Sequence, residues 1–215
     1  MEENINPFDK AGKVLVVIGV LDILFMIYAI SNKMSYSSSF NIFAVIAGIY
    51  LIKGGVKTAR AVRWFSAFAV IAFTAMYILM PFSFPFELTA TQFKLNPLGM
   101  SASYIIGLIF IAILAWVYTQ LSTPASLAIL KEAGYNTGKP KSALYIASSL
   151  IIMGIVFTAM FLNGESAKKA EELAKAELGI NYKYRISSLS TSGNTGSANV
   201  TAYNSNEIRN VQVSW

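Results

Sequence analysis

Residues 101–121 read SASYIIGLIFIAILAWVYTQL, without a charged side chain. A helix of roughly 20 apolar residues is long enough to cross the hydrocarbon core of a bilayer. The whole chain is similarly apolar, because 55% of its 215 residues are hydrophobic and 13% are charged, unlike ordinary soluble domains. The sequence therefore predicts an integral membrane protein, an all-α bundle of five transmembrane helices at about residues 13–31, 38–52, 62–80, 101–121 and 143–162.

The second of these stretches is the shortest. Its uninterrupted apolar run covers only residues 40–52. It crosses the membrane only if residues 37–39 lie at one interface and the Lys53 side chain extends to the headgroups at the other. Otherwise it is a buried or re-entrant segment.

The connections between the stretches differ in charge. Cytoplasmic loops of membrane proteins carry an excess of Lys and Arg. A cytoplasmic N-terminus assigns only Lys33 and Lys94 to the outer loops. With five crossings the C-terminus is then extracytoplasmic, and we expect a bacterial inner (plasma) membrane. The cations assigned to the cytoplasmic side are Lys10, Lys13, Lys53, Lys57, Arg60, Arg63, Lys131, Lys139 and Lys141.

The connection at residues 53–64 reads KGGVKTARAVRW. Its two glycines interrupt the helix, and its cations and tryptophan suit the headgroup level of a bilayer. We expect either a site for anionic lipid headgroups or ordinary orienting charge. The residues concerned are Lys53, Lys57, Arg60, Arg63 and Trp64.

The outer connection at residues 81–100 combines three prolines with four phenylalanines. A hydrated loop has little need of so many aromatic side chains, so we expect it to lie along the membrane surface, to pack under the C-terminal tail or to contact a partner. Its prolines argue against one continuous helix. The partner-binding candidates are Phe82, Phe84, Phe86 and Phe93.

Residues 164–215 are predicted to form an extracytoplasmic α+β unit after a transmembrane domain of residues 1–163. Residues 165–178 combine Glu/Lys pairs four positions apart with an Ala/Leu face, which predicts a soluble helix that ends at Gly179. The period then becomes twofold, which indicates three strands of an antiparallel sheet. Their alternating apolar residues are Tyr182, Tyr184 and Ile186, then Ala198, Val200 and Ala202, then Val211, Val213 and Trp215.

The tail unit is small, and a single core is marginal below roughly 70 residues. We therefore expect it to rest on residues 81–100, on a second copy of the chain or on another protein. Trp215 either fills the core of the unit or marks an edge strand that pairs with a partner.

The composition excludes several chemistries. The chain has no His and no Cys, which removes imidazole and thiolate metal ligands and the usual Ser/His and Cys/His nucleophiles. The apolar stretches have no paired carboxylates, and no Walker loop is present. We expect no enzyme, catalytic residue, metal or cofactor. The net charge of +6 fits orienting cations better than a nucleic-acid partner, since no nucleic-acid-binding motif accompanies it.

Asp22 lies midway along the first apolar stretch, where an acidic side chain costs roughly 3 kcal/mol. It must therefore face protein or water. It is either a proton- or cation-responsive site or a protonated acid that hydrogen-bonds between helices. The substitution Asp22→Asn separates the two, because ion-coupled activity would be lost whereas packing would survive.

These observations favour a noncatalytic membrane accessory, assembly or sensing subunit that presents the tail unit to a protein partner or to a second copy. The alternative is a small proton- or cation-coupled transporter or channel that uses Asp22. A lipid-modifying enzyme ranks third, because the usual acid and base groups are missing.

Overall fold

The computed structural model describes residues 6–34, 36, 41–193 and 195–215. The chain forms two compact units. One comprises Met1–Ile71 with Phe110–Ala147, and the other comprises Ala72–Ile109 with Ser148–Trp215. The domain boundary expected at residue 163 stays a prediction.

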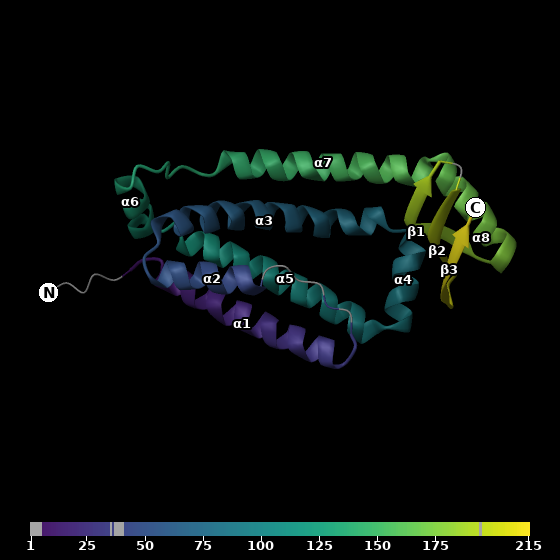
Figure 1. The fold of residues 1–215 in the computed structure, drawn as a ribbon, viewed down its shortest axis with the longest axis horizontal. Coiled ribbons are helices and arrows are strands. Elements are labelled where there is room, and N and C mark those ends of the chain that lie inside the picture. The colour runs from purple at the N-terminus through teal and green to yellow at the C-terminus, as the bar shows by residue number, and fades with distance from the viewer. Residues whose placement is uncertain (1–5, 35, 37–40, 194) are drawn as a thin grey trace. The chain divides into compact units, whose positions relative to one another are not determined.

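Four helices are long and apolar enough to cross a membrane, so the mostly helical architecture is confirmed and the chain has the features of a membrane protein. Each helix begins two to six residues before the predicted stretch that it covers, and α5 ends one residue before its stretch does. Hydropathy marks only the apolar part of a helix, whereas backbone hydrogen bonding continues into the polar turns at its ends. The helices are α1 (Asp9–Ser31), α3 (Val56–Ser83), α5 (Pro97–Gln120) and α7 (Lys141–Asn163) (Figure 1).

The second predicted span is shorter than a membrane crossing. It forms α2 (Asn41–Ile52), a helix of 12 residues that is about 18 Å long against a hydrocarbon core of about 30 Å. Of the five predicted spans, four therefore lie in helices that are long and apolar enough to cross a membrane. Residues 37–40, which would complete the crossing, lie outside the described residues.

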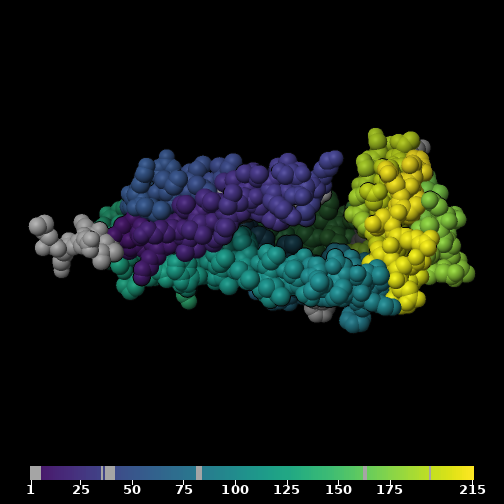
Figure 2. Space-filling model, turned by 90° about the horizontal axis from the view of Figure 1, so that it is seen from below, coloured from purple at the N-terminus to yellow at the C-terminus, as the bar shows by residue number. Residues whose placement is uncertain are grey.

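In the first unit, two glycines bring α1 and α2 into backbone contact. A Cβ atom at Gly12 would lie 2.7 Å from the Gly48 carbonyl oxygen, and one at Gly48 would lie 2.6 Å from the Gly12 carbonyl oxygen. The Asn6 amide donates to the carbonyl oxygens of Leu51 and Ile52 at 2.8 and 2.9 Å, so it closes the C-terminal end of α2. Figure 2 shows α2 (blue) against the N-terminal part of α1 (purple). These contacts make α1 and α2 an antiparallel hairpin.

The core of the first unit also includes α6 (Pro124–Glu132). This short helix begins after Thr123, whose hydroxyl accepts from the Ser126 amide, and the chain turns at Gly134 with φ of 79°. Leu130 of α6 is buried with residues of α1, α2, α3 and α5. The fully buried members of this cluster are Phe8, Ala11, Leu51, Ala59, Val117, Leu121 and Leu130.

The second unit contains two further helices. The first, α4 (Phe86–Leu95), occupies the proline-free interval between Pro85 and Pro97, so the expectation of no continuous helix through residues 81–100 holds. The second, α8 (Glu165–Leu178), has the predicted bounds, and Gly179 follows it with φ of 86°.

A three-stranded antiparallel sheet of order β1-β2-β3 completes the second unit. Its strands are β1 (Lys183–Ser192), β2 (Thr195–Tyr203) and β3 (Ile208–Ser214). Ile186 pairs with Val200, and Val200 pairs with Val211, so these predicted apolar positions share one face, whereas Tyr182 lies just before β1. A bulge lies between Ile186 and Ser188. Figure 1 shows α8 alongside this sheet.

The core of the α+β unit is built from small residues. Ala167, Ala170 and Ala174 of α8 are buried against the apolar face of the sheet, and their short side chains allow the helix to approach closely. Trp215 is half-buried against this core. A Cβ atom at Gly196 would lie 2.5 Å from the Trp215 ring, so the indole packs over glycine. This position supports the interpretation of Trp215 as core filling.

Candidate functional sites

The outward face of the sheet is polar and mostly uncharged. The Thr201 hydroxyl donates to Asn210 Oδ1 at 2.9 Å and lies 2.6 Å from the Ser187 hydroxyl, so a hydrogen-bonded row crosses the three strands. Asn199 donates to the Ser188 hydroxyl at 2.8 Å. These side chains alternate with the buried ones along each strand. We name this surface the polar sheet face: Ser187, Ser188, Asn199, Thr201, Asn210 and Gln212.

One end of the sheet is attached to α4 by side-chain contacts. Thr91, only 2% exposed, donates its hydroxyl to the Asn204 carbonyl oxygen at 2.8 Å. Lys94 donates to the Ser205 carbonyl oxygen and to Asn206 Oδ1, both at 3.1 Å. The Lys183 ammonium also pairs with Glu87. The expected support of the tail unit by residues 81–100 is therefore present, and it comes from α4.

The turn between β2 and β3 carries a charged cluster of its own. Glu207 accepts hydrogen bonds from the Tyr182 hydroxyl and from the Arg209 guanidinium, which lower the pKa of its carboxyl. The Tyr182 bond in turn raises the pKa of that phenol. The Asn204 side chain accepts from the Asn206 and Glu207 amides. The β2–β3 turn is thus held both by its own hydrogen bonds and by those from α4.

The predicted partner-binding aromatics have different environments. Phe93 is half-buried and stacks on Tyr104 with ring centroids 5.6 Å apart. The Arg185 guanidinium lies 4.7 Å from the Phe84 ring centroid. Phe86 is 86% exposed, and the Phe82 side chain lies outside the described residues. Among those described, Phe86 is the aromatic most available to a partner.

Asp22 is half-buried on α1. The Gly48 backbone contacts Gly12 and Val16, and α2 begins seven residues before Gly48, about 10 Å along the axis. In an antiparallel pair this register places the first turn of α2 level with Asp22. Both interpretations of Asp22, as a hydrogen-bonded acid between helices and as a proton- or cation-responsive site, stay predictions.

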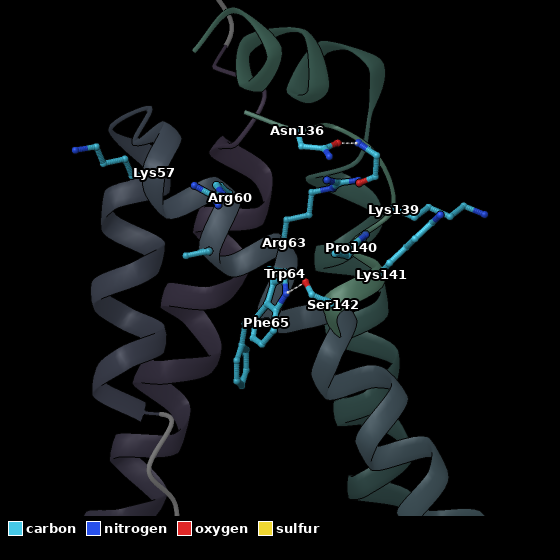
Figure 3. A pocket seen from close by; sticks show the side chains of 12 residues that line it. Lys57, Arg60, Arg63, Trp64, Phe65, Asn136, Lys139, Pro140, Lys141 and Ser142 are labelled. Atoms are coloured by element: carbon cyan, nitrogen blue, oxygen red, sulfur yellow. Dashed lines mark hydrogen bonds between the residues drawn. The ribbon is translucent and has the colours of Figure 1, made fainter. Parts of the chain in front are cut away.

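A pocket of about 1030 Å³ lies between the start of α3 and the start of α7 in the first unit. Figure 3 shows side chains of α3 and of residues 136–142 around it. No carboxylate lines the pocket, and within the described part of the chain none pairs with its five cations. We name it the basic pocket; its polar and aromatic lining residues are Lys57, Arg60, Arg63, Trp64, Phe65, Asn136, Lys139, Lys141 and Ser142.

Neutral groups hold the cations and the tryptophan of the basic pocket in place. Arg63 is only 6% exposed; its Nε donates to the Ser122 hydroxyl at 2.9 Å, and its Nη2 donates to two backbone carbonyls. Arg60 lies 4.8 Å from the Tyr135 ring centroid. Trp64 Nε1 donates to the Ser142 hydroxyl at 2.9 Å, as the dashed line in Figure 3 shows. The site therefore keeps its positive charge.

The structure places four of the five predicted headgroup residues around the basic pocket. Lys57, Arg60, Arg63 and Trp64 line the basic pocket, whereas Lys53 does not. The sequence interpretation missed residues 136–142, which supply Lys139 and Lys141 to the same site. In the sequence, these residues are marked only by two lysines just before an apolar stretch. Such charges are common at the cytoplasmic ends of transmembrane helices, so they do not indicate a site. No family model, curated protein or solved structure matches the chain.

Proposed function

We propose that the chain is a noncatalytic integral membrane subunit whose helices anchor the α+β unit and present it to a partner on the extracytoplasmic side. The observation that carries this proposal is the attachment of the β2–β3 turn to α4 through Thr91 and Lys94. A flexibly tethered domain needs no such contacts. A domain that must offer a surface at a fixed position on its anchor benefits from them, because binding then orders little additional chain.

The polar sheet face supports a role in recognition. Its hydroxyl and amide groups offer both donors and acceptors, and they are exposed or half-buried. In the same unit, Phe86 adds an exposed aromatic ring, the kind of side chain that dominates binding energy when a partner covers it. The partner is another protein or a second copy of the chain.

The α1–α2 hairpin supports an odd number of crossings. The Asn6 amide binds the end of α2, so the chain returns after α2 to the side from which α1 starts, although α2 itself is short. Three further helices that cross then place the C-terminus on the opposite side. The excess of Lys and Arg near the N-terminal side makes that side cytoplasmic, in a bacterial inner membrane.

Single cysteines test the orientation, because the natural chain contains none. We expect Ser205→Cys to react with a membrane-impermeant maleimide in intact spheroplasts. The matched variant Lys131→Cys, also at an exposed position, should react only after lysis. The reverse pattern would show that the tail unit faces the cytoplasm.

A photoreactive amino acid tests the proposed recognition surface in living cells. We expect a discrete crosslinked product from position 212 on the polar sheet face or from position 86. Position 172, on an exposed part of α8, is the control and should give none. A product of twice the chain mass identifies a second copy as the partner. Absence of any product from both test positions, with normal amounts of the protein, would contradict the proposal.

A further inference from the structure

We propose that the basic pocket binds the phosphate-bearing headgroup of an anionic lipid, and that an adjoining apolar cavity holds part of the same lipid's acyl chain. This inference is independent of the partner-binding role of the α+β unit. It rests on the charge of the pocket, on the donors left available in it and on the apolar cavity beside it.

The charge of the basic pocket selects an anion. Five cations line a single site, and no carboxylate of the described residues neutralises them. Like charges that line one site repel one another unless a negative ligand lies between them. Cations spread over a helix end would be enough to orient the protein. Here cations of two separate segments, α3 and residues 139–141, line one cavity, although the Lys57, Lys139 and Lys141 side chains extend away from its middle (Figure 3).

Arg63 is held so that part of its guanidinium stays available. The group carries five N–H donors, and Nε and Nη2 bind the Ser122 hydroxyl and two carbonyls. Nη1 donates no hydrogen bond within the described part of the chain, where every fully buried side-chain nitrogen or oxygen has a partner. Nη1 is therefore not fully buried, and it belongs to a residue that lines the pocket. A guanidinium fixed in this way suits phosphate oxygens.

Two neighbouring groups add donors to the same site. The Ser142 oxygen accepts from Trp64, so its own hydroxyl hydrogen remains available to donate. The N-terminus of α7 begins at Lys141 and contributes its partial positive charge. Both groups complement a phosphate and neither attracts a cation.

An apolar cavity of about 410 Å³ adjoins the basic pocket. The two spaces share Lys139, Pro140 and Lys141 as lining residues. The remaining walls of the second cavity are mostly apolar and come from α3, α5 and α7, among them Val70, Ala115 and Leu144. Free phosphate would use only the basic pocket, whereas a lipid uses both. This head-and-tail arrangement favours the lipid.

The position along the helices agrees with a lipid. Lys57, Arg60 and Arg63 precede or begin the apolar run of α3, and Lys139 and Lys141 directly precede that of α7. The basic pocket therefore lies where headgroups meet hydrocarbon, and the apolar cavity lies further along the same helices.

Native mass spectrometry of the full chain in mild detergent measures lipid binding directly. The probes are phosphatidylglycerol, phosphatidylcholine with the same acyl chains, and water-soluble glycerol phosphate. The test variant is Lys139→Gln/Lys141→Gln. The control, Lys10→Gln/Lys131→Gln, removes the same charge from the first unit outside the basic pocket. Because one cation near anionic lipid is worth about a fivefold change in affinity, we expect about 30-fold weaker phosphatidylglycerol binding in the test variant and little change in the control.

Filling the apolar cavity separates lipid from free phosphate. Ala115→Phe should weaken phosphatidylglycerol binding, and Val70→Phe repeats the test at a second wall position in case the first variant folds poorly. The proposal would be overturned by equal binding of phosphatidylcholine and phosphatidylglycerol, or by equal losses in the test and control lysine variants. Glycerol phosphate binding as tight as phosphatidylglycerol binding and unaffected by the filled cavity would also overturn it, in favour of a free-phosphate site.

Discussion

The contact between Gly12 and Gly48 makes a quantitative prediction for Gly48→Ala. The added Cβ would lie 2.6 Å from the Gly12 carbonyl oxygen and 2.9 Å from the Val16 amide nitrogen. Ordinary contacts begin at 3.4 Å, so α1 and α2 must separate by roughly 0.8 Å or distort locally. Overpacking of this kind costs about 1–3 kcal/mol. It acts on backbone atoms, which cannot move aside as a flexible side-chain end can.

The matched control is Gly154→Ala on α7, where nothing lies within 4 Å of the added Cβ. Both substitutions gain the same helix propensity, up to about 1 kcal/mol, so the difference between the variants isolates the packing cost. Thermal unfolding in one detergent measures it, at about 2–4 °C per kcal/mol for a chain of this size. Gly48→Ala should unfold several degrees below Gly154→Ala. Equal unfolding temperatures would refute the close approach of α1 and α2.

Two further predictions concern the turn between β2 and β3. Thr91→Val should leave the Asn204 carbonyl oxygen without its partner, at a cost of about 1–3 kcal/mol. Amide hydrogen exchange at residues 204–207 should therefore accelerate about 5- to 150-fold. The control Thr89→Val removes only a hydrogen bond to the Pro85 carbonyl oxygen at the start of α4 and should leave this exchange rate unchanged. For Glu207, the Tyr182 and Arg209 hydrogen bonds lower the carboxyl pKa, so its contribution to stability is full above its unfolded pKa of about 4.3 and is lost as the pH falls through the lowered folded value. The unfolding temperature of the natural chain should exceed that of Glu207→Gln at neutral pH and converge with it in acid; a gap that is constant with pH would contradict this role.

The sequence predicts the α+β unit closely because its signals are local. Glu/Lys pairs and Gly179 define α8, and twofold alternation identifies the buried Ala198, Val200 and Val211. The short α2 shows where such reasoning weakens. Hydropathy locates its apolar residues, but whether helix continues through the preceding serines depends on tertiary context.

Sites between segments distant in sequence are harder to predict. Gly12 and Gly48 are 36 positions apart, and no local pattern pairs them. The basic pocket likewise joins Arg63 to residues 136–142 through backbone carbonyls, which every residue possesses and no composition reveals. Charge in each segment is visible in the sequence, whereas only the fold shows that both segments line one cavity.

The short helix α4 has one further consequence. Two residues connect it to α3 and one residue connects it to α5, while Thr91 and Lys94 bind the β2–β3 turn. A displacement of the sheet by a bound partner would therefore be transmitted to α3 and α5 without an intervening flexible linker. The contacts that fix the sheet on α4 would then also transmit partner binding to α3 and α5. Thr91→Val would weaken this transmission, because it removes the hydrogen bond to Asn204.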